Sequence, residues 1–160
     1  MLNLPVLVYG TLRPGGGNYN WALKGRTIEE KTVRLNGLRM YAAAHGGFPY
    51  AAYGDEKDQL VADLITVEDK HYEQVLSSLD RLEGYYGVDD PRNFYDRLRF
   101  CLNINSTPIQ AWIYLITDPS FLEGLVHVRN GDWLDFDAKL SQAHQAEEAV
   151  STQEYKSLVS

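Results

Sequence analysis

An acidic residue, Glu83, stands where the sequence pattern predicts an apolar one. The segment 69–83 has the spacing of a helix, and Glu83 falls on the same narrow stripe as Tyr72, Leu76 and Leu79. A buried carboxylate is costly unless it is paired or protonated, and the negative end of the helix dipole also disfavours an anion there. Because both effects raise a carboxyl pKa, Glu83 is a candidate general acid/base.

Simpler interpretations of this residue stay open. Glu83 can form an ion pair with Arg97 or Arg13, or its carboxylate can reach solvent at a frayed helix end. Asp80 lies at the edge of the stripe, where a solvated or capping role is expected. The pattern therefore gives little support to a pair of catalytic carboxylates of the glycosidase type.

A second stretch that could do chemistry is VLVYGTLRPGGGNYNW, residues 6–21. A short buried strand over Val6–Val8 breaks into a loop with Pro14 and the glycines Gly15–Gly17. Such a loop exposes backbone N–H groups that can cradle a carboxylate, a phosphate or an oxyanion. The patterns of a P-loop and of a dinucleotide fingerprint are both missing, so we expect a ligand smaller than a nucleotide. The alternative is a flexible connection without a ligand.

The composition limits the class of protein. A chain of 160 residues with 44% hydrophobic and 23% charged residues fits one globular domain. The formal net charge is −7 and no Lys/Arg cluster stands out, so a nucleic-acid partner is not expected. We expect no signal peptide, and no stretch approaches the ~20 apolar residues that span a membrane.

The single cysteine, Cys101, excludes an internal disulfide and fits a cytoplasmic location. Its neighbours Phe100 and Leu102 predict a buried thiol. The four histidines show no metal-ligand spacing, so we expect no metal site: His45, His71, His127 and His144.

The predicted elements follow the order strand, strands, helix, strands, helix, which indicates an α+β protein with a curved, partly closed sheet and helices outside it. We expect one domain over residues 1–149 and a flexible tail over 150–160. The strands are predicted over 6–8, 33–41 with a bend at Gly37, 48–53, 60–67, 94–104 and 109–117. The helices are predicted over 69–83, 119–125 and 134–149, and a loop or short helix over 22–32.

Two motifs together resemble a known family. The first is Tyr-Gly-Thr-Leu-Arg-Pro-Gly at residues 9–15, with Asn18 following. The second is Leu-Asp-Arg-Leu-Glu-Gly at residues 79–84, with Tyr-Asp-Arg at 95–97. Over residues 4–135 the chain resembles the γ-glutamylcyclotransferase superfamily, which includes γ-glutamylamine cyclotransferase-like and AIG2-like proteins.

This resemblance implies a β-barrel-like core with outer helices and a pocket at its mouth. It also implies release of 5-oxoproline from γ-glutamyl compounds without metal or cofactor, with Glu83 as the acid/base. The residues expected to contact the substrate are those of the first loop, largely through backbone N–H groups, and a tyrosine that lines the pocket: Tyr9, Gly10, Thr11, Leu12 and Tyr95.

One departure affects the substrate. The segment 84–94 is longer than in the compact γ-glutamylamine enzymes and carries Asp89, Asp90 and Arg92, so substrate identity does not transfer. The expected partner is a small γ-glutamyl amine or peptide, with neither nucleic acid nor membrane, and the sequence does not indicate an oligomeric state. The main alternative is a protein of the same fold that binds a small ligand without turnover. A structural or interaction protein is a third, less favoured interpretation.

Overall fold

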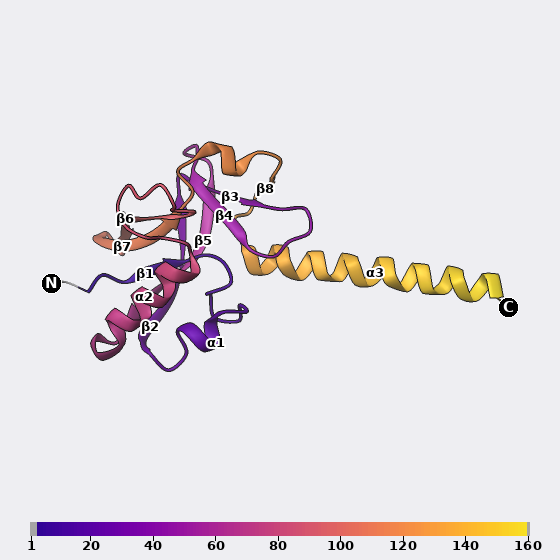
Figure 1. Cartoon of the computed structure of the whole chain (residues 1–160), viewed down its shortest axis with the longest axis horizontal. Helices are drawn as coiled ribbons and strands as arrows, with labels where there is room; N and C mark the ends of the chain where they lie inside the picture. The colour runs from indigo at the N-terminus through magenta and orange to yellow at the C-terminus, as the bar shows by residue number, and fades with distance from the viewer. Residues whose placement is uncertain (1–2, 160) are drawn as a thin grey trace.

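The chain forms two β-sheets with helices outside them, as the computed structural model in Figure 1 shows. The structure describes residues 3–159, with side-chain surroundings for residues 3–146. The strands are β1 (Val6–Val8), β2 (Thr27–Asn36), β3 (Leu38–Ala42), β4 (Pro49–Tyr53), β5 (Gln59–Val67), β6 (Asp96–Ile104), β7 (Thr107–Leu115) and β8 (Val126–Val128). The helices are α1 (Tyr19–Ala22), α2 (Tyr72–Leu82) and α3 (Trp133–Val159), with short 3-10 helices η1 (Asp69–His71) and η2 (Pro119–Leu122).

The larger sheet has the strand order β2-β5-β1-β7-β6. Strand β1 lies at its centre, antiparallel to β5 and parallel to β7, so that Leu7 lies beside Leu64 and Ile113. Val6, Leu7 and Val8 are all buried, which is the pattern of a strand covered on both faces. The glycine-rich loop therefore leaves from the middle of the sheet.

The two faces of the larger sheet pack against different layers. On one face, Leu7 and Ile113 share an apolar core with Met40 of β3 and Val128 of β8, which belong to the smaller sheet β4-β3-β8. On the other face, Val6 and Val8 pack with α1 and α2 in a second core, which includes Val75. Because side chains alternate along β1, this strand contributes to both cores, and it ends where the first loop begins.

The β-barrel expected from the resemblance is wrong, because neither sheet closes on itself, whereas the predicted α+β class is confirmed. In the described part of the chain, β2 pairs only with β5 and β6 only with β7, so β2 and β6 are edge strands. Gly37 follows β2 at φ +83°, a backbone conformation that favours glycine, and there the chain turns into the other sheet.

Strand β2 begins at Thr27, inside the segment predicted as a loop or short helix. Its residues Glu29, Glu30 and Lys31 are exposed because β2 lies at the edge of the sheet. Charged residues are common on edge strands, so they concealed this strand from a search for apolar alternation. The single strand predicted over 33–41 is in fact the end of β2 followed by β3.

Cys101 is exposed, so the prediction of a buried thiol is wrong. It lies on edge strand β6, where alternation buries Leu102 and turns Cys101 to the opposite face. Strand β8 was not predicted, because a strand of three residues is too short to show a period.

Helix α3 projects away from the two sheets as one long helix (Figure 1). Trp133 at its first turn is buried in the core between the sheets, while the helix continues through Val159. It therefore extends into the segment 150–160 predicted as a flexible tail; residue 160 lies outside the described residues, and the flexibility stays a prediction. None of the described helices combines the length and apolar character needed to cross a membrane.

Candidate active site

Backbone carbonyl groups of the loop after β1 accept hydrogen bonds that hold its fold, whereas several of its N–H groups have no acceptor among the described residues. The Gly10 carbonyl accepts a hydrogen bond from the Arg13 N–H at 3.1 Å, and the Thr11 carbonyl accepts one from the Asn18 N–H at 2.8 Å. Among the described residues, none accepts a hydrogen bond from the N–H of Gly10, Thr11 or Leu12. Unpaired amides in a turn of this kind form an anion-binding concavity.

Close packing fixes the shape of this loop. Gly10 lies so near Pro49 that a Cβ atom on residue 10 would be 2.6 Å from Pro49 Cγ. The Asn18 side-chain amide donates to the Thr11 hydroxyl at 2.8 Å, and the Trp21 indole N–H donates to Asn18 Oδ1 at 2.7 Å. The loop is therefore a packed turn, in contrast to the flexible connection that the glycines alone would allow.

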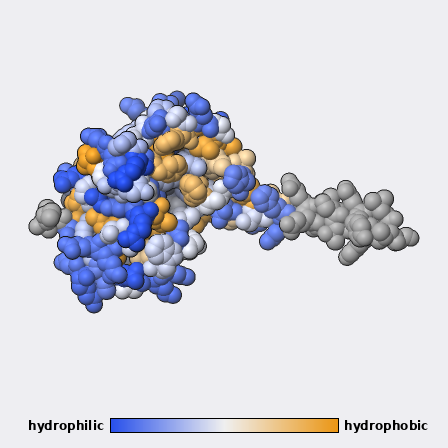
Figure 2. Space-filling view, in the orientation of Figure 1, coloured by the Kyte–Doolittle hydropathy of each residue, from blue (hydrophilic) through white to orange (hydrophobic). Residues whose placement is uncertain are grey.

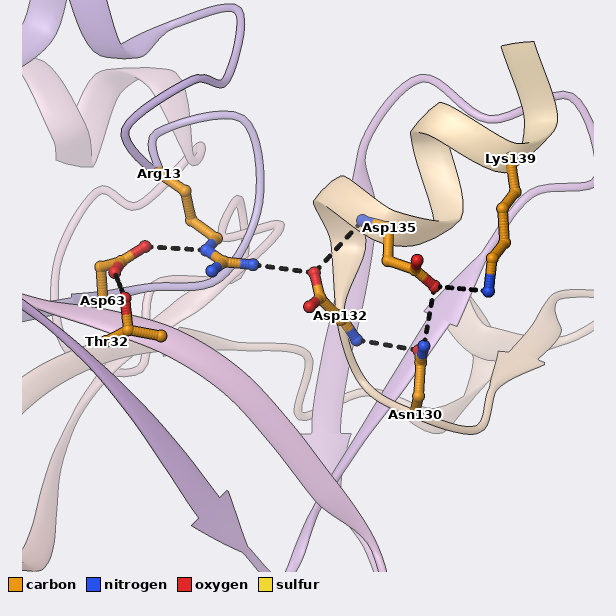
Figure 3. A network of polar contacts seen from close by, with 7 residues as sticks. All are labelled: Arg13, Thr32, Asp63, Asn130, Asp132, Asp135 and Lys139. Carbon is orange, nitrogen blue, oxygen red and sulfur yellow. Dashed lines mark hydrogen bonds and ion pairs between the residues drawn. The ribbon is translucent and has the colours of Figure 1, made fainter. Parts of the chain in front are cut away.

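Arg13 links the loop through ion pairs to two parts of the chain that are distant in sequence (Figure 3). Its buried guanidinium donates from Nε to Asp63 of β5 at 2.8 Å and from Nη1 to Asp132, just before α3, at 3.0 Å. The Thr32 hydroxyl donates to the second oxygen of Asp63 at 2.6 Å. A buried cation shared by two carboxylates is well compensated, so Arg13 is a structural anchor of the loop.

Glu83 is the C-cap residue of α2, one position beyond the last helical residue. Gly84 follows at φ +67° and its N–H donates to the Arg81 carbonyl at 3.3 Å, while the Tyr85 N–H donates to the Asp80 carbonyl at 2.8 Å. These two bonds form a Schellman motif, so the predicted stop at Gly84 is confirmed.

The residues after the helix are fastened to those that lead into β6. The Tyr95 N–H donates to the Glu83 carbonyl at 3.3 Å, and the Phe94 N–H donates to the Gly84 carbonyl at 2.9 Å. The intervening segment 85–93 therefore forms a closed loop beside the site. The backbone of Glu83 is thus held by the end of α2 on one side and by the hydrogen bond from Tyr95 on the other.

Asp80 holds a partly buried network, which corrects its prediction as a solvated or capping residue. Arg97 Nη1 lies 3.0 and 2.7 Å from the two Asp80 oxygens, and the Tyr114 hydroxyl donates to Asp80 Oδ1 at 2.7 Å. The guanidinium of Arg97 also lies over the Trp112 ring, 4.5 Å from its centroid. Asp80 thus links α2 to both β6 and β7.

The Glu83 carboxyl has no ion-pair partner in the part of the chain that the structure describes. Arg13 and Arg97, the two partners considered for it, bind other carboxylates. Burial raises the pKa of Glu83 from 4.5 to about 7. A carboxyl with this pKa exchanges a proton readily at neutral pH, which is the property required of a general acid/base.

Buried tyrosines form the wall around this carboxyl. The Tyr9 hydroxyl donates to the Tyr114 carbonyl at 2.5 Å, and the Tyr95 hydroxyl donates to the Pro49 carbonyl at 2.6 Å. Burial raises the pKa of Tyr9 and Tyr95 well above the ordinary value, and the nearby Glu83 adds to the rise. Both phenols are therefore neutral at physiological pH, and their protons are already committed to backbone carbonyls.

The loop, the glutamate and the tyrosines line one cavity of about 300 Å³. This cavity brings together all six residues named from the sequence: Tyr9, Gly10, Thr11, Leu12, Glu83 and Tyr95. The other lining residues include Asn18, Phe48, Pro49, Leu82, Phe94 and Tyr114. One carboxyl with a raised pKa thus lines the same cavity as Gly10, Thr11 and Leu12, whose backbone N–H groups are unpaired among the described residues.

Sequence reasoning missed several residues of the wall. Tyr114 reaches the cavity because β7 pairs with β1, and a parallel pairing between strands so far apart in the chain leaves no local signal. Phe48 and Phe94 begin two predicted strands, and an aromatic residue at such a position is a weak signal that could have suggested them. Within the described chain, no group of three or more His, Cys, Asp or Glu residues is placed to hold a metal ion.

Comparisons with known proteins identify the family of this chain. The family described as "Gamma-glutamyl cyclotransferase, AIG2-like" matches residues 6–135. The chain is 29% identical over 144 residues to gamma-L-glutamyl-butirosin B gamma-glutamyl cyclotransferase from Niallia circulans, covering 89% of this chain and 82% of that protein.

Two crystal structures share the fold. An uncharacterized protein from Pyrococcus horikoshii has a TM-score of 0.56 at 19% identity, over 88% of this chain and 98% of the other. A uropathogenic E. coli-specific protein has a TM-score of 0.52 at 13% identity, over 84% and 95%.

Proposed function

Because this chain belongs to the gamma-glutamyl cyclotransferase, AIG2-like family, we propose that it cyclises the γ-glutamyl unit of an amine or peptide to 5-oxoproline and releases the amine. The observation that carries this proposal is the shared cavity: Glu83, with a pKa of about 7, lines the same space as the unpaired N–H groups of the first loop. The cytoplasmic location that the single cysteine suggests stays a prediction.

In the proposed reaction the α-nitrogen of the substrate attacks its own γ-carbonyl carbon. A new carbon–nitrogen bond closes the five-membered ring, and the bond from the same carbon to the departing amine breaks. Glu83 as the carboxylate takes a proton from the α-ammonium group and returns a proton to the leaving nitrogen. No covalent enzyme intermediate is needed, because nucleophile and electrophile belong to one molecule.

The N–H groups of Gly10, Thr11 and Leu12 are proposed to hold either the α-carboxylate of the substrate or the oxyanion that develops on the γ-carbonyl. One well-placed donor to an oxyanion contributes about 2.7–4 kcal/mol to the barrier reduction. Tyr9 and Tyr95 shape the wall and keep it dry, and their neutral rings leave Glu83 as the titrating side chain of the cavity.

The test is release of 5-oxoproline from a panel of γ-glutamyl amines and peptides. We expect Glu83→Gln, which keeps the shape and removes the proton acceptor, to lower kcat by about 10²–10⁴-fold. Glu73→Gln is the matched control, since Glu73 is exposed on the same helix. Equal turnover by wild type and Glu83→Gln would exclude the proposed role. Binding without any product across the panel would instead favour the ligand-binding alternative.

A further inference from the structure

The cavity has a closed end and an apolar open end. Tyr9, Leu12 and Tyr95 are buried, whereas two large apolar lining residues are exposed, Phe48 by 46% and Leu82 by 39%. Figure 2 shows a broad group of hydrophobic residues over the smaller sheet, with smaller groups elsewhere on the same face. Exposed aromatic side chains beside a cavity commonly mark a contact with a ligand.

Three phenylalanines continue the cavity wall outward, and we call them the aromatic rim: Phe48, Phe94 and Phe121. Phe94 and Phe121 are stacked with ring centroids 5.3 Å apart, and Phe48 meets Phe94 edge-on at 6.5 Å. Phe121 is 40% exposed. The rim therefore offers a preformed cluster of aromatic rings beside the cavity.

The proposed reaction determines which part of the substrate reaches the aromatic rim. The γ-carbonyl carbon must lie between Glu83 and the amides of the first loop, deep in the cavity. The substituent on the departing nitrogen then extends toward the exposed Phe48 and Leu82, because buried side chains such as Tyr9 and Tyr95 close other parts of the wall. The rim is thus in the path of the leaving group.

Charge beyond the rim disfavours one class of leaving group. On the far side of Phe94 and Phe121 lies a second hollow of about 270 Å³, whose walls include Asp90, Asp96 and Asp118. None of the described residues that line either hollow is Lys, Arg or His. Arg92 pairs with Asp90, with Nη2 at 2.8 Å from Oδ2, but Asp96 and Asp118 have no ion-pair partner among the described residues. A leaving group with its own carboxylate would therefore meet like charge there.

We propose that the aromatic rim is the subsite for the leaving amine and selects an amine with an aromatic body and no carboxylate over an α-amino acid or a short alkylamine. This inference rests on the proposed function and names the substrate class for the same site. It resolves the choice between γ-glutamyl amine and γ-glutamyl peptide in favour of the amine.

Three substrates test the preference for an aromatic ring and the preference against a carboxylate separately. γ-Glutamylphenethylamine and γ-glutamylethylamine differ by the phenyl ring, and γ-glutamylphenethylamine and γ-glutamylphenylalanine differ by one carboxylate. We expect kcat/KM for 5-oxoproline release to be about tenfold higher for the phenethylamine compound than for either of the others, as suits one aromatic contact or one like-charge repulsion. Equal values for the first pair, or a preference for the phenylalanine compound, overturn the proposal.

Variants of the aromatic rim test whether its phenylalanines cause the preference for an aromatic leaving group. Phe94→Ala and Phe121→Ala should each reduce the ratio between the phenethylamine and ethylamine compounds to about threefold or less. Tyr53→Ala is the control, since Tyr53 is an aromatic residue exposed by 61% that lines neither hollow, and its ratio should match wild type. An unchanged ratio in both phenylalanine variants overturns the assignment to the rim.

A binding measurement separates this inference from the proposed function. If no compound yields 5-oxoproline, the proposed function fails. Calorimetric titration of the same three compounds then decides the rim by itself. Tighter binding of the phenethylamine compound supports the subsite, whereas equal binding of all three overturns it.

Discussion

The backbone N–H of Tyr95 donates a hydrogen bond to the carbonyl oxygen of Glu83 at 3.3 Å, while the side chains of both residues line the same cavity. The end of α2 and the start of β6 are thus joined at the candidate site itself. This joint fixes the backbone of Glu83 without supplying a charge to its carboxylate. The carboxyl is held in place without a cationic partner to offset the burial that raises its pKa.

That raised pKa predicts a dependence of stability on pH. Glu83 has a pKa of about 7 in the folded protein against an ordinary value of 4.5, so the folded state binds this proton more tightly. The associated stabilisation is complete below pH 4.5 and is lost as the pH rises through 7. Relative to Glu83→Gln, the wild-type free energy of unfolding should fall by about 3 kcal/mol between pH 4 and pH 8.

Urea denaturation of both proteins at the two pH values measures this difference. Glu73→Gln serves again as the control and should show no comparable change, because Glu73 is exposed. A difference between wild type and Glu83→Gln that stays constant over this pH range would show that the carboxyl is solvated in the folded protein.

Arg97 and Arg99 allow a comparison between two arginines on one face of β6. Both guanidinium groups lie over Trp112, at 4.5 and 5.4 Å, yet only Arg97 also contacts Asp80. Lysine cannot reproduce the planar group that binds Asp80 and stacks on the ring. We expect Arg97→Lys to lower the free energy of unfolding by about 2 kcal/mol and Arg99→Lys by under about 0.5 kcal/mol. Thermal or urea unfolding measures both, and equal losses would contradict a special role for the Asp80 network.

Two glycines of the first loop differ in the space around them. A Cβ atom on residue 10 would press on Pro49, whereas one on residue 17 would meet no atom within 4 Å. Gly10→Ala should therefore cost about 1–3 kcal/mol of stability and displace the loop amides, which lowers kcat/KM. Gly17→Ala should stay within about 0.5 kcal/mol of wild type and keep full activity. Normal stability and turnover in Gly10→Ala would mean that the loop adjusts freely.

Much of this arrangement could be predicted from the sequence because its signals are local. The helical stripe identified α2, the break after Val8 identified the loop, and Glu83 stood out as a polar residue among apolar ones. The cavity is lined by all six residues that the sequence analysis named for the site, and their catalytic and binding roles stay proposals.

What could not be predicted depends on contacts between distant residues. The partners of Arg13 and Arg97 were not identifiable, because several carboxylates were available and no local pattern selects Asp63 or Asp80. The open sheets, the charged edge strand β2 and the outward-facing Cys101 all follow from strand order. Strand order is decided by packing across the whole chain.

The ion pair between Arg13 and Asp132 joins residues 119 positions apart. During synthesis, the loop that carries the free amides leaves the ribosome early, and Glu83 follows well before the chain reaches Asp132. A nascent chain that has not reached that point carries both parts of the candidate chemistry but lacks one of the two carboxylates that hold Arg13. Completion of this anchor therefore waits until Asp132 has been made, long after both parts of the candidate chemistry.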